Sequence, residues 1–450
     1  MSDSMAETIR PFDEIPIITR PDDYSLQLPE FLARMAQEHG PIFRRRMDDP
    51  MQTGLGPWIV YMVGPEANRF VMHTQRDHFS HEQGWTPEIG PLFEKGLLNT
   101  DDPEHAYQRK MMNPAFAIAY MSRYIPIMQR IMADRTRDWA ARGNVDMYQE
   151  ARKITFDVAA EALVGFQTGA QVDRLREVFN TMLNGDFDFT SEQEAIATFT
   201  SLQSQLKTLL LAMIAERRAA PTDDILGLLI QARNEDGKGF SDLELIGQLE
   251  ILLVAGHETT TSMSAWLFYL LAQHPDYLQR VQQELRDVLG TTDGAMTLEK
   301  VKALPILSRA IDETGRLYSP VGNVPRGVLK DFVFNGYRVP AGEVHLILSL
   351  AGCHRLPTIF AEPGRFDPDR FAPPREEDKR TPYALVPFGG GPRICIGINF
   401  AQIEIKVMAA HILQHFTLAP VADAQPLQAY YGPTANIVGG LLLHVTPRQA

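Results

Sequence analysis

The residues most able to do chemistry gather in residues 388–397, which read Phe-Gly-Gly-Gly-Pro-Arg-Ile-Cys-Ile-Gly. The cysteine of this stretch, Cys395, is one of two cysteines in 450 residues. Three glycines and a proline predict a tight turn, because glycine allows the positive φ angles that direct successive N–H groups onto one anion. The apolar run 396–416 predicts a helix, whose positive end favours a thiolate at Cys395. A thiolate cradled by amides is a ligand or a nucleophile, whereas a lone cysteine is more often buried and inert.

The surrounding sequence excludes several kinds of site at this turn. No Lys-Ser or Lys-Thr pair follows the glycines, so the turn is not a phosphate-binding loop. No second cysteine lies nearby, and zinc and iron–sulfur sites therefore lack ligands. A cysteine nucleophile would need a positioned histidine, and none is evident. What remains is a metal with a single axial thiolate, which is haem of the oxygen-activating type.

A second reactive stretch lies at residues 255–261, which read Ala-Gly-His-Glu-Thr-Thr-Thr. Apolar periodicity predicts a helix over 241–273 around it, and the helix begins with a Ser-Asp-Leu-Glu capping box at Ser241. At 1.5 Å per residue this helix is roughly 50 Å long, enough to cross a domain. Glycine and threonine are poor helix formers, so the centre of the helix predicts a functional kink.

These stretches together resemble the cytochrome P-450 family of haem-thiolate monooxygenases. Residues 388–397 are similar to the family's haem-ligand loop, and residues 255–260 to its Ala-Gly-x-Glu-Thr-Thr motif. The family's Glu-x-x-Arg and His-x-x-x-Arg pairs have counterparts at 313–316 and 105–109. The resemblance covers roughly residues 40–445. It implies a mainly α fold with a small β region, and haem b bound between the long central helix and the Cys-ligand loop.

The resemblance also assigns roles around the cofactor. Cys395 would be the axial ligand of the haem iron, Thr259 would hydrogen-bond dioxygen, and Glu258 would help to relay protons. The residues expected to hold the haem, several of them as partners of its carboxylates, are His105, Arg109, Arg326, Phe388, Arg393, Cys395 and Gly397.

Two further sets of residues follow from the same resemblance. Glu313, Arg316 and Arg370 would form a buried structural network that fixes the Cys395 loop. An apolar substrate pocket is implied, which leaves fatty acids, terpenoids, steroids and aromatic hydrocarbons open as substrates. The residues expected to line this pocket are Trp85, Phe93, Leu97, Leu98, Phe187, Phe189, Val321, Val324, Ile437 and Val438.

The remaining elements are expected to position these residues within one domain spanning 1–450. Helical periodicity predicts a mainly helical chain, with a helix at 28–39 and several more across 121–232. Residues 78–98 are rich in glycine and proline and predict a long irregular loop, and residues 1–24 a tail or lid. The β-rich parts are expected at about 41–64, 321–350 and 430–446, the last of them as a hairpin that dips into the pocket.

The sequence assigns no definite role to a few further charged residues. The run Arg44–Arg46 could hold a substrate carboxylate, but a solvated strand edge is the preferred interpretation. The roles of His354 and Arg355 are left open by the sequence.

Amino-acid composition limits the kinds of partner and the cellular compartment to be expected for this protein. With 43 basic and 56 acidic residues the net charge is −13, which argues against nucleic acid or an anionic membrane as the main partner. No stretch approaches the roughly 20 apolar residues of a membrane anchor. Two cysteines are too few for a disulfide framework, so a cytoplasmic location is expected. A monomer without an appended reductase domain is expected.

The predicted reaction inserts one oxygen atom from O2 into an apolar substrate, by hydroxylation or epoxidation. Electrons would come from NAD(P)H through a reductase and a separate ferredoxin or similar donor, with Arg109, Lys110 and Lys406 helping to dock it. A peroxide-driven peroxygenase, a haem-thiolate isomerase and a non-catalytic haem-binding sensor are the alternatives. The Glu258-Thr259 pair favours the oxygenase over all three.

Overall fold

The computed structural model describes residues 9–48, 56–166, 170–184, 191–290, 295–421, 427–432 and 434–448. Contacts divide the chain into two compact units. The first unit comprises Met1–Glu88, Asp312–Cys395 and Gln428–Val438, and the second comprises Ile89–Ile311, Ile396–Leu427 and Gly439–Ala450. No helix in the described part of the chain is both long and apolar enough to cross a lipid bilayer.

The first unit is built around a five-stranded mixed sheet. In this sheet β2 and β8 are parallel, and the other neighbouring strands are antiparallel. Apolar side chains of the central strands, among them Val60, Leu346 and Leu348, are fully buried and form the core of the unit. In spatial order the strands are β1 (Ile42–Arg46), β2 (Trp58–Val63), β8 (Val344–Ser349), β5 (Asn323–Val328) and β3 (Phe79–Ser80).

Short elements surround this sheet. A β6–β7 hairpin turns through Asn335 and Gly336, whose positive φ angles of 47° and 78° give the type I′ turn that the Asn-Gly pair predicts. The remaining elements are α1 (Leu28–His39), α2 (Pro65–Arg69), α3 (His81–Ile89), β6 (Phe332–Phe334), β7 (Tyr337–Val339), α15 (Leu350–Cys353), α16 (Glu377–Arg380), β10 (Ala429–Tyr431) and β11 (Ala435–Ile437), with α14 (Pro305–Leu317) crossing the division between the units.

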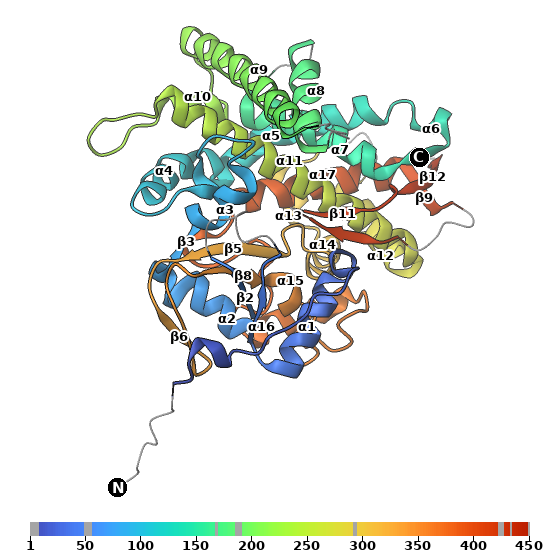
Figure 1. Cartoon of the computed structure of the whole chain (residues 1–450). Coiled ribbons are helices and arrows are strands. Elements are labelled where there is room, and N and C mark those ends of the chain that lie inside the picture. The colour runs from blue at the N-terminus through green and yellow to red at the C-terminus, as the bar shows by residue number, and fades with distance from the viewer. Residues whose placement is uncertain are drawn as a thin grey trace. The chain divides into compact units, whose positions relative to one another are not determined.

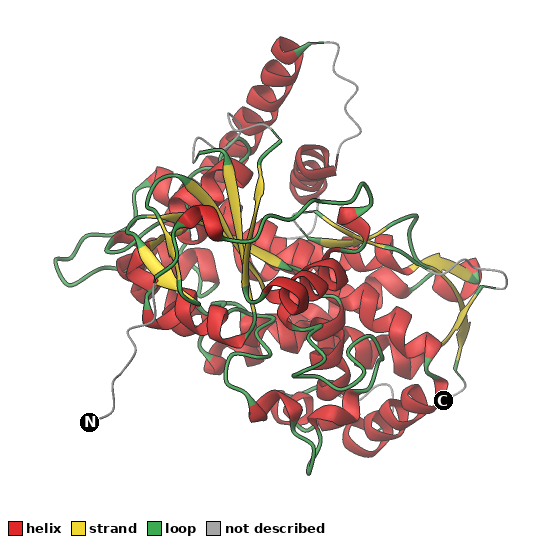
Figure 2. Cartoon of the chain, turned by 60° about the horizontal axis from the view of Figure 1, so that its bottom comes forward, coloured by secondary structure: helices red, strands yellow, loops and turns green. Residues whose placement is uncertain are grey.

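The second unit is a helical assembly around α11 (Asp242–Gln273), with a small β4-β12-β9 sheet (Figures 1 and 2). Ser241 caps α11 with the predicted capping box. The helix is buried on nearly every side, as expected of a helix at the centre of a core. Its companions are α4 (Glu104–Met112), α5 (Ile118–Thr136), α6 (Trp139–Arg142), β4 (Asn144–Asp146), α7 (Met147–Val158), α8 (Ala170–Asn184), α9 (Glu192–Ala219), α10 (Ile225–Gln231), α12 (Pro275–Leu289), α13 (Leu298–Lys302), α17 (Ile398–His415), β9 (Phe416–Pro420) and β12 (Leu442–Pro447).

The prediction of an irregular loop over 78–98 was partly wrong, because residues His81–Ile89 form the helix α3. Its glycine serves packing rather than a turn. A Cβ atom on Gly84 would lie 2.5 Å from the carbonyl oxygen of Pro325, so only glycine lets α3 approach β5 this closely.

The prediction of a solvated edge was wrong for Arg44, whose side chain is buried on the edge strand β1. Its guanidinium donates to the carbonyl oxygens of Ile15 and Asp13 at 3.2 and 2.9 Å. It also lies over the rings of Phe12 and Trp58, at 4.5 and 4.2 Å from their centroids. The N-terminal segment therefore covers this edge, and Ile15 belongs to the core rather than to a polar tail.

The prediction of a single C-terminal hairpin was also wrong. β10 and β11 pair with one another in the first unit, whereas β12 pairs with β4 and β9 in the second. A Cβ atom at Gly440 would lie 2.4 Å from a carboxylate oxygen of Asp146, the residue that precedes α7.

Candidate functional site

The turn that carries Cys395 is tight and leaves the residue exposed. Gly389 and Gly391 have φ angles of 72° and 66°, which L-amino-acid side chains rarely allow. A Cβ atom on Gly391 would lie 2.2 Å from the carbonyl oxygen of Met72. The Cys395 N–H donates to the Phe388 carbonyl oxygen at 2.9 Å and closes the turn. Because Cys395 is exposed, a buried and inert role is excluded for it.

The other cysteine has the inert character. Cys353 is buried, and its thiol donates to the Ala384 carbonyl oxygen at 3.5 Å. Burial raises the pKa of the Cys353 thiol to about 12, so it stays protonated at neutral pH. After Cys395 the chain enters α17, which starts at Ile398 with Gly397 as its N-cap, two residues later than predicted.

The first unit brings Glu313, Arg316 and Arg370 together in a fully buried network. The Arg316 guanidinium donates two hydrogen bonds to the Glu313 carboxylate, at 2.7 and 2.8 Å, and Arg370 donates to the same carboxylate at 3.0 Å. Arg370 also donates to Glu377 at 2.7 Å, and Glu377 in turn pairs with Arg375. Sequence reasoning missed these last two residues, because no spacing signal connects them to Glu313.

His354 links this network to the approach to the Cys395 turn. Its Nε2 accepts from the Val386 N–H at 3.0 Å, so its Nδ1 carries the proton and donates to the Ser319 hydroxyl at 3.0 Å. Burial, together with the nearby charges of Arg316 and Arg355, lowers the pKa of His354 to about 3. The ring is therefore neutral, and it fixes the backbone two residues before Phe388.

Arg355 has a comparable anchoring role. Its guanidinium donates to the carbonyl oxygens of Leu317 and Pro363, at 2.7 and 3.0 Å, and pairs with Glu30 of α1 at 3.2 Å. Both residues that the sequence left open are thus buried anchors of the first unit.

The predicted haem and substrate residues of the first unit differ in burial. Arg326 of β5 is buried and donates to the Pro325 carbonyl oxygen at 2.6 Å. Ile437 of β11 is buried, whereas Val438 is exposed. The side chains of intermediate exposure are Trp85, Val321 and Val324.

In the second unit, the centre of α11 differs from the rest of that helix. Ala255 is exposed and Thr259, one turn later, is partly exposed, although the helix is otherwise mostly buried. The Thr259 hydroxyl donates to the Ala255 carbonyl oxygen at 2.6 Å, and the Thr261 hydroxyl donates to the His257 carbonyl oxygen at 3.0 Å. Both hydroxyls thus bond to the preceding turn of the helix, which remains continuous through the point where the sequence predicts a kink.

Glu258 lies beside Thr259 in sequence but takes a different partner. Its carboxylate is buried and pairs with Arg152 of α7 at 3.3 Å. The Arg152 carbonyl oxygen lies 3.1 Å from the His257 Nε2, and the His257 ring packs edge-on against Phe156 of the same helix. Burial lowers the pKa of His257, so the histidine is neutral. The sequence predicted Glu258 as a site residue, but it contained no signal for Arg152.

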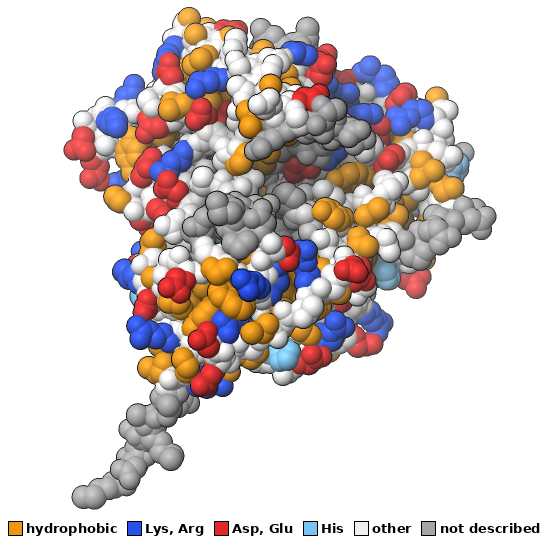
Figure 3. Space-filling view, viewed as in Figure 1, with side chains coloured by type: hydrophobic (Ala, Val, Ile, Leu, Met, Phe, Trp, Pro, Cys, Tyr) orange, Lys and Arg blue, Asp and Glu red, His pale blue; other side chains and the backbone are white. Residues whose placement is uncertain are grey.

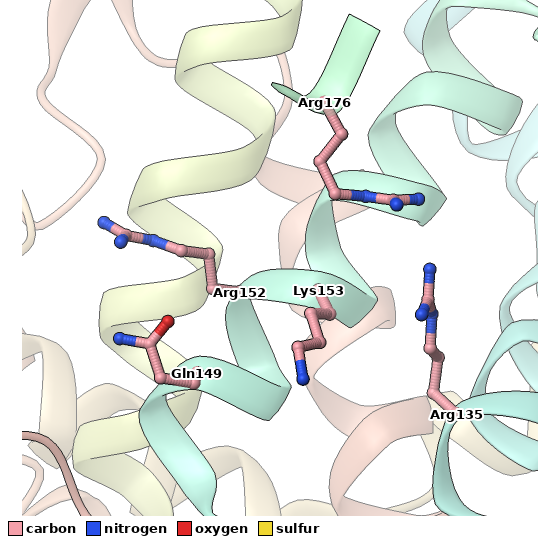
Figure 4. A pocket seen from close by; sticks show the side chains of 5 residues that line it. All are labelled: Arg135, Gln149, Arg152, Lys153 and Arg176. Carbon is pink, nitrogen blue, oxygen red and sulfur yellow. The ribbon is translucent and has the colours of Figure 1, made fainter. Parts of the chain in front are cut away.

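A cavity of about 210 Å³ lies next to this ion pair (Figure 4). The lining residues are Arg135, Gln149, Arg152, Lys153 and Arg176, and none of them was predicted to contact substrate. In Figure 4, Arg152 extends toward α11, away from Arg135. Arg152 thus both lines the cavity and pairs with Glu258.

The other predicted residues of the second unit lie on α4 and before it. His105 and Arg109 are one turn apart on α4, where His105 pairs with Asp102 at 3.3 Å and Arg109 donates to Asn113 at 3.1 Å. Phe93 is buried against Phe179 of α8, with ring centroids 5.8 Å apart. Leu97 is buried, and Leu98 is partly exposed. Phe187 and Phe189 lie outside the described residues.

The side chains present fit a haem ligated by one thiolate. Cys395 offers an accessible sulfur on a rigid turn, which suits an axial ligand. Histidine and arginine side chains at His105, Arg109, Arg326 and Arg393 are donors of the kind that pairs with haem carboxylates.

Comparisons with known proteins identify the family. The sequence model of the cytochrome P450 family matches residues 15–447. Cytochrome P450 136 of Mycobacterium tuberculosis is 32% identical over 398 residues, covering 87% of this chain and 78% of the relative. Cytochrome P450 120 of Synechocystis is 32% identical over 400 residues, covering 87% of each chain.

Solved structures agree with the sequence comparison. Cyanobacterial CYP120A1, solved with retinoic acid bound, aligns at a TM-score of 0.83 and 27% identity, covering 96% of this chain and 100% of that one. The cytochrome P450DA heme domain aligns at 0.84 and 24% identity, over 98% and 99% of the chains, and supports the fold. This chain therefore belongs to the cytochrome P450 family. It is a haem-containing P450 monooxygenase with the predicted, mainly α fold.

Proposed function

We propose that this P450 inserts one oxygen atom from O2 into an apolar organic substrate, with haem b ligated by Cys395. The observation that carries the proposal is the exposed Cys395 on a glycine turn, next in sequence to segments held by the buried Glu313 network and by His354. A ligand loop fixed in this way holds its sulfur in one position before the cofactor binds. We propose that the whole chain acts as one functional P450 unit.

The haem would be held mainly through its carboxylates. Arg393, Arg326, His105 and Arg109 would pair with these carboxylates through charge-assisted hydrogen bonds. Phe388 and Gly397 would flank the ligand. When bound, the thiolate-ligated haem supplies the chemistry that cleaves the O–O bond of dioxygen.

Two side chains of α11 are proposed to handle protons. The Thr259 hydroxyl now donates to the Ala255 carbonyl oxygen, and it would turn outward to donate to the oxygen substrate. Glu258 would replenish that proton, and to do so its carboxylate must exchange Arg152 for water or for Thr259. The cavity that Arg152 lines would supply the water for this exchange.

The substrate is proposed to be an apolar small molecule. The side chains proposed to contact it are mostly aliphatic or aromatic. Because the related CYP120A1 was solved with retinoic acid, this acid is a rational first ligand in a screen for spin-state shifts of the haem. Fatty acids, terpenoids, steroids and aromatic hydrocarbons complete the screen.

The electron donor is proposed to be a separate ferredoxin, reduced by an NAD(P)H-dependent reductase. Arg109, Lys110 and Lys406 would contribute positive charge to its docking surface, although Lys110 also pairs with Glu235. Charges of both signs are otherwise interspersed over the face seen in Figure 3. A monomer in the cytoplasm remains the prediction for this protein.

The absorption spectrum of the reduced, carbon monoxide-bound protein tests the ligand assignment. A strongly red-shifted Soret band that disappears in Cys395→Ala is expected for thiolate ligation. A band typical of histidine-ligated haem in the wild-type protein would overturn the proposal.

Turnover assays then separate the alternatives. An oxygenase forms product with NAD(P)H and a ferredoxin system, whereas a peroxygenase needs only hydrogen peroxide. An isomerase converts its substrate without either supply, and a sensor forms no product under any of these conditions.

A further inference from the structure

Segment 90–97, which joins α3 to the next short helical turn, is bonded to α11 through two backbone N–H groups. The Glu94 N–H donates to the Glu250 carboxylate at 2.7 Å, and the Leu97 N–H donates to the Gln248 side-chain oxygen at 3.0 Å. Both acceptors are buried. Gln248 is itself held by Gln108 of α4, whose side-chain oxygen accepts from its amide at 2.9 Å. Gln248 and Glu250, two residues apart on α11, thus each accept a hydrogen bond from segment 90–97.

The backbones of this segment and of α11 also touch directly. A Cβ atom on Gly96 would lie 2.6 Å from the Gly247 carbonyl oxygen, and one on Gly247 would lie 2.1 Å from the Lys95 carbonyl oxygen. Each glycine is therefore required for the close approach that puts the N–H groups within reach of their acceptors. This close contact lies at the Leu97 end of the segment.

The Glu94 end depends more on side chains. Gln203 of α9 donates to the Pro91 carbonyl oxygen at 2.8 Å, and Lys207 of α9 pairs with the Glu94 carboxylate at 3.2 Å. These two α9 residues, unlike Gly96, are on a partly solvated helix face. The contact with Glu250 is the buried bond at this end.

The two acceptors differ in one chemical respect, since a carboxyl group titrates and an amide does not. Burial, and secondly the carboxylate of Glu94, raise the pKa of Glu250 to about 7, while the Glu94 N–H and the Lys207 ammonium act in the opposite direction. The charges facing Glu250 are thus those of Glu94 on the segment and Lys207 on α9. Arg152 of α7 is engaged by Glu258, two turns further along α11.

We propose that Glu250 and Gln248 are positioning residues that hold segment 90–97 on α11, and that ionisation of Glu250 loosens the Glu94 end while Gln248 keeps the Leu97 end attached. Phe93 lies within the end that loosens, and Leu97 within the end that stays. The consequence for substrate rests on the proposed function, in which both side chains contact substrate. The attachment itself does not depend on it.

The direction of the effect follows from proton linkage. Closed segment 90–97 keeps Glu250 buried with its raised pKa, and an open segment would expose the carboxyl to water and restore its ordinary value of 4.5. The closed state therefore binds the proton more tightly, so acid favours closure and alkali favours opening. With those two values, the ratio of open to closed segment rises about tenfold between pH 6 and pH 8.

Amide hydrogen exchange on the full-length, haem-loaded protein tests the proposal without any turnover. The measured quantity is the ratio of the exchange rates of the Glu94 and Leu97 amides, because intrinsic base catalysis affects both amides alike and cancels. In the wild-type protein this ratio is expected to rise about tenfold from pH 6 to pH 8. In Glu250→Gln it is expected to stay constant, because glutamine keeps the acceptor oxygen and cannot ionise.

Glu244→Gln is the matched control, because Glu244 is an acid of the same helix whose carboxylate accepts from the N–H and the hydroxyl of the Ser241 cap. It should retain the wild-type pH response. A wild-type ratio that does not change with pH overturns the proposal, even if Glu250→Gln fails to fold. An equal pH dependence of the exchange ratio in Glu250→Gln and in the wild type would also overturn the proposal.

The consequence for substrate has its own readout. The dissociation constant of a spin-shifting ligand should increase from pH 6 to pH 8 in the wild type and change less in Glu250→Gln. If hydrogen exchange follows the prediction but ligand affinity does not, the positioning role stands and the proposed substrate contact of Phe93, which lies in the end that loosens, is wrong. If the carbon monoxide spectrum lacks the thiolate band, the proposed function fails while the exchange result is unaffected.

Discussion

Replacement of Arg316 should destabilise this protein far more than replacement of an exposed arginine in the same unit. Arg316 is fully buried and donates to both oxygens of the Glu313 carboxylate. Its guanidinium also donates to the carbonyl oxygens of His354, Pro363 and Arg365, at 3.0, 2.7 and 3.2 Å. Arg316→Met fills much of the same volume but removes all of these donors, although Pro363 keeps a hydrogen bond from Arg355, and Arg365 one from Arg370.

The expected loss follows from the partners left behind. Removing one member of a buried ion pair costs about 3–5 kcal/mol, because the remaining charge is desolvated and uncompensated. Here Arg370 stays bound to Glu313, so the lower end of that range, about 3 kcal/mol, is expected. Arg365→Gln is the matched control. Arg365 is exposed and pairs with the equally exposed Glu362, so its loss should cost less than about 1 kcal/mol.

Denaturant unfolding of the haem-loaded proteins, followed by far-ultraviolet circular dichroism and by the Soret band, measures both effects. Arg316→Met should have a much lower midpoint than Arg365→Gln, and its Soret band should be lost no later than its helical signal. Equal midpoints for the two variants would refute the reasoning that the Glu313 network holds the first unit together.

Three further predictions concern catalysis, pH and electron transfer. Thr259→Ala should lower product formation by roughly tenfold or more and divert electrons to hydrogen peroxide, which is measured as peroxide formed per NAD(P)H consumed; unchanged coupling would remove Thr259 from the proton pathway. Because the pKa of His354 is lowered, its neutral ring contributes stability that is present above the ordinary pKa of 6.5 and is lost as pH falls toward 3. The unfolding midpoint of His354→Gln should therefore depend less steeply on pH in this range than that of the wild type. Parallel pH profiles for the two proteins would contradict this prediction. Lys406→Glu should slow reduction of the haem by an acidic ferredoxin by about tenfold at low salt and by less at high salt. The control Lys153→Glu should leave the reduction rate unchanged. Equal rates for the two variants would exclude Lys406 from the docking surface.

The elements that the sequence predicted well are those determined within a few residues. The helix Leu28–His39 has the predicted bounds, and the strands Ile42–Arg46 and Trp58–Val63 lie within the β-rich part predicted at about 41–64. Helix α11 starts one residue after the predicted Ser241, because its capping box is complete within four residues. Local periodicity and local hydrogen bonding are sufficient at these positions.

Several partners that the sequence did not predict are distant along the chain. Glu258 pairs with Arg152, 106 residues earlier, and Glu250 accepts from the Glu94 N–H, 156 residues earlier. No spacing rule connects such residues, because folding of the whole unit brings them together. Arg44 was assigned to solvent for the same reason, since Phe12 and Asp13, which cover it, are about thirty residues away.

Long-range packing also leaves one acid of α17 in an unfavourable position. Glu404 is fully buried, and within the described part of the chain neither of its carboxyl oxygens has a hydrogen-bond partner. Burial raises the pKa of Glu404 well above its ordinary value. A raised pKa means that its contribution to stability is present below pH 4.5 and is lost as pH rises through the higher value, so Glu404 costs most at neutral and alkaline pH.

Glu404→Met should therefore act in the opposite direction to Arg316→Met. A buried polar group without a partner costs about 1–3 kcal/mol, so its replacement by an apolar side chain of similar length should raise the free energy of unfolding by about that amount at pH 7. The gain should shrink at pH 5, where the acid is less costly. Denaturant titrations at the two pH values measure this difference. A loss of stability at pH 7 would instead mean that Glu404 donates its proton to an acceptor, and that a polar bond rather than desolvation governs this position.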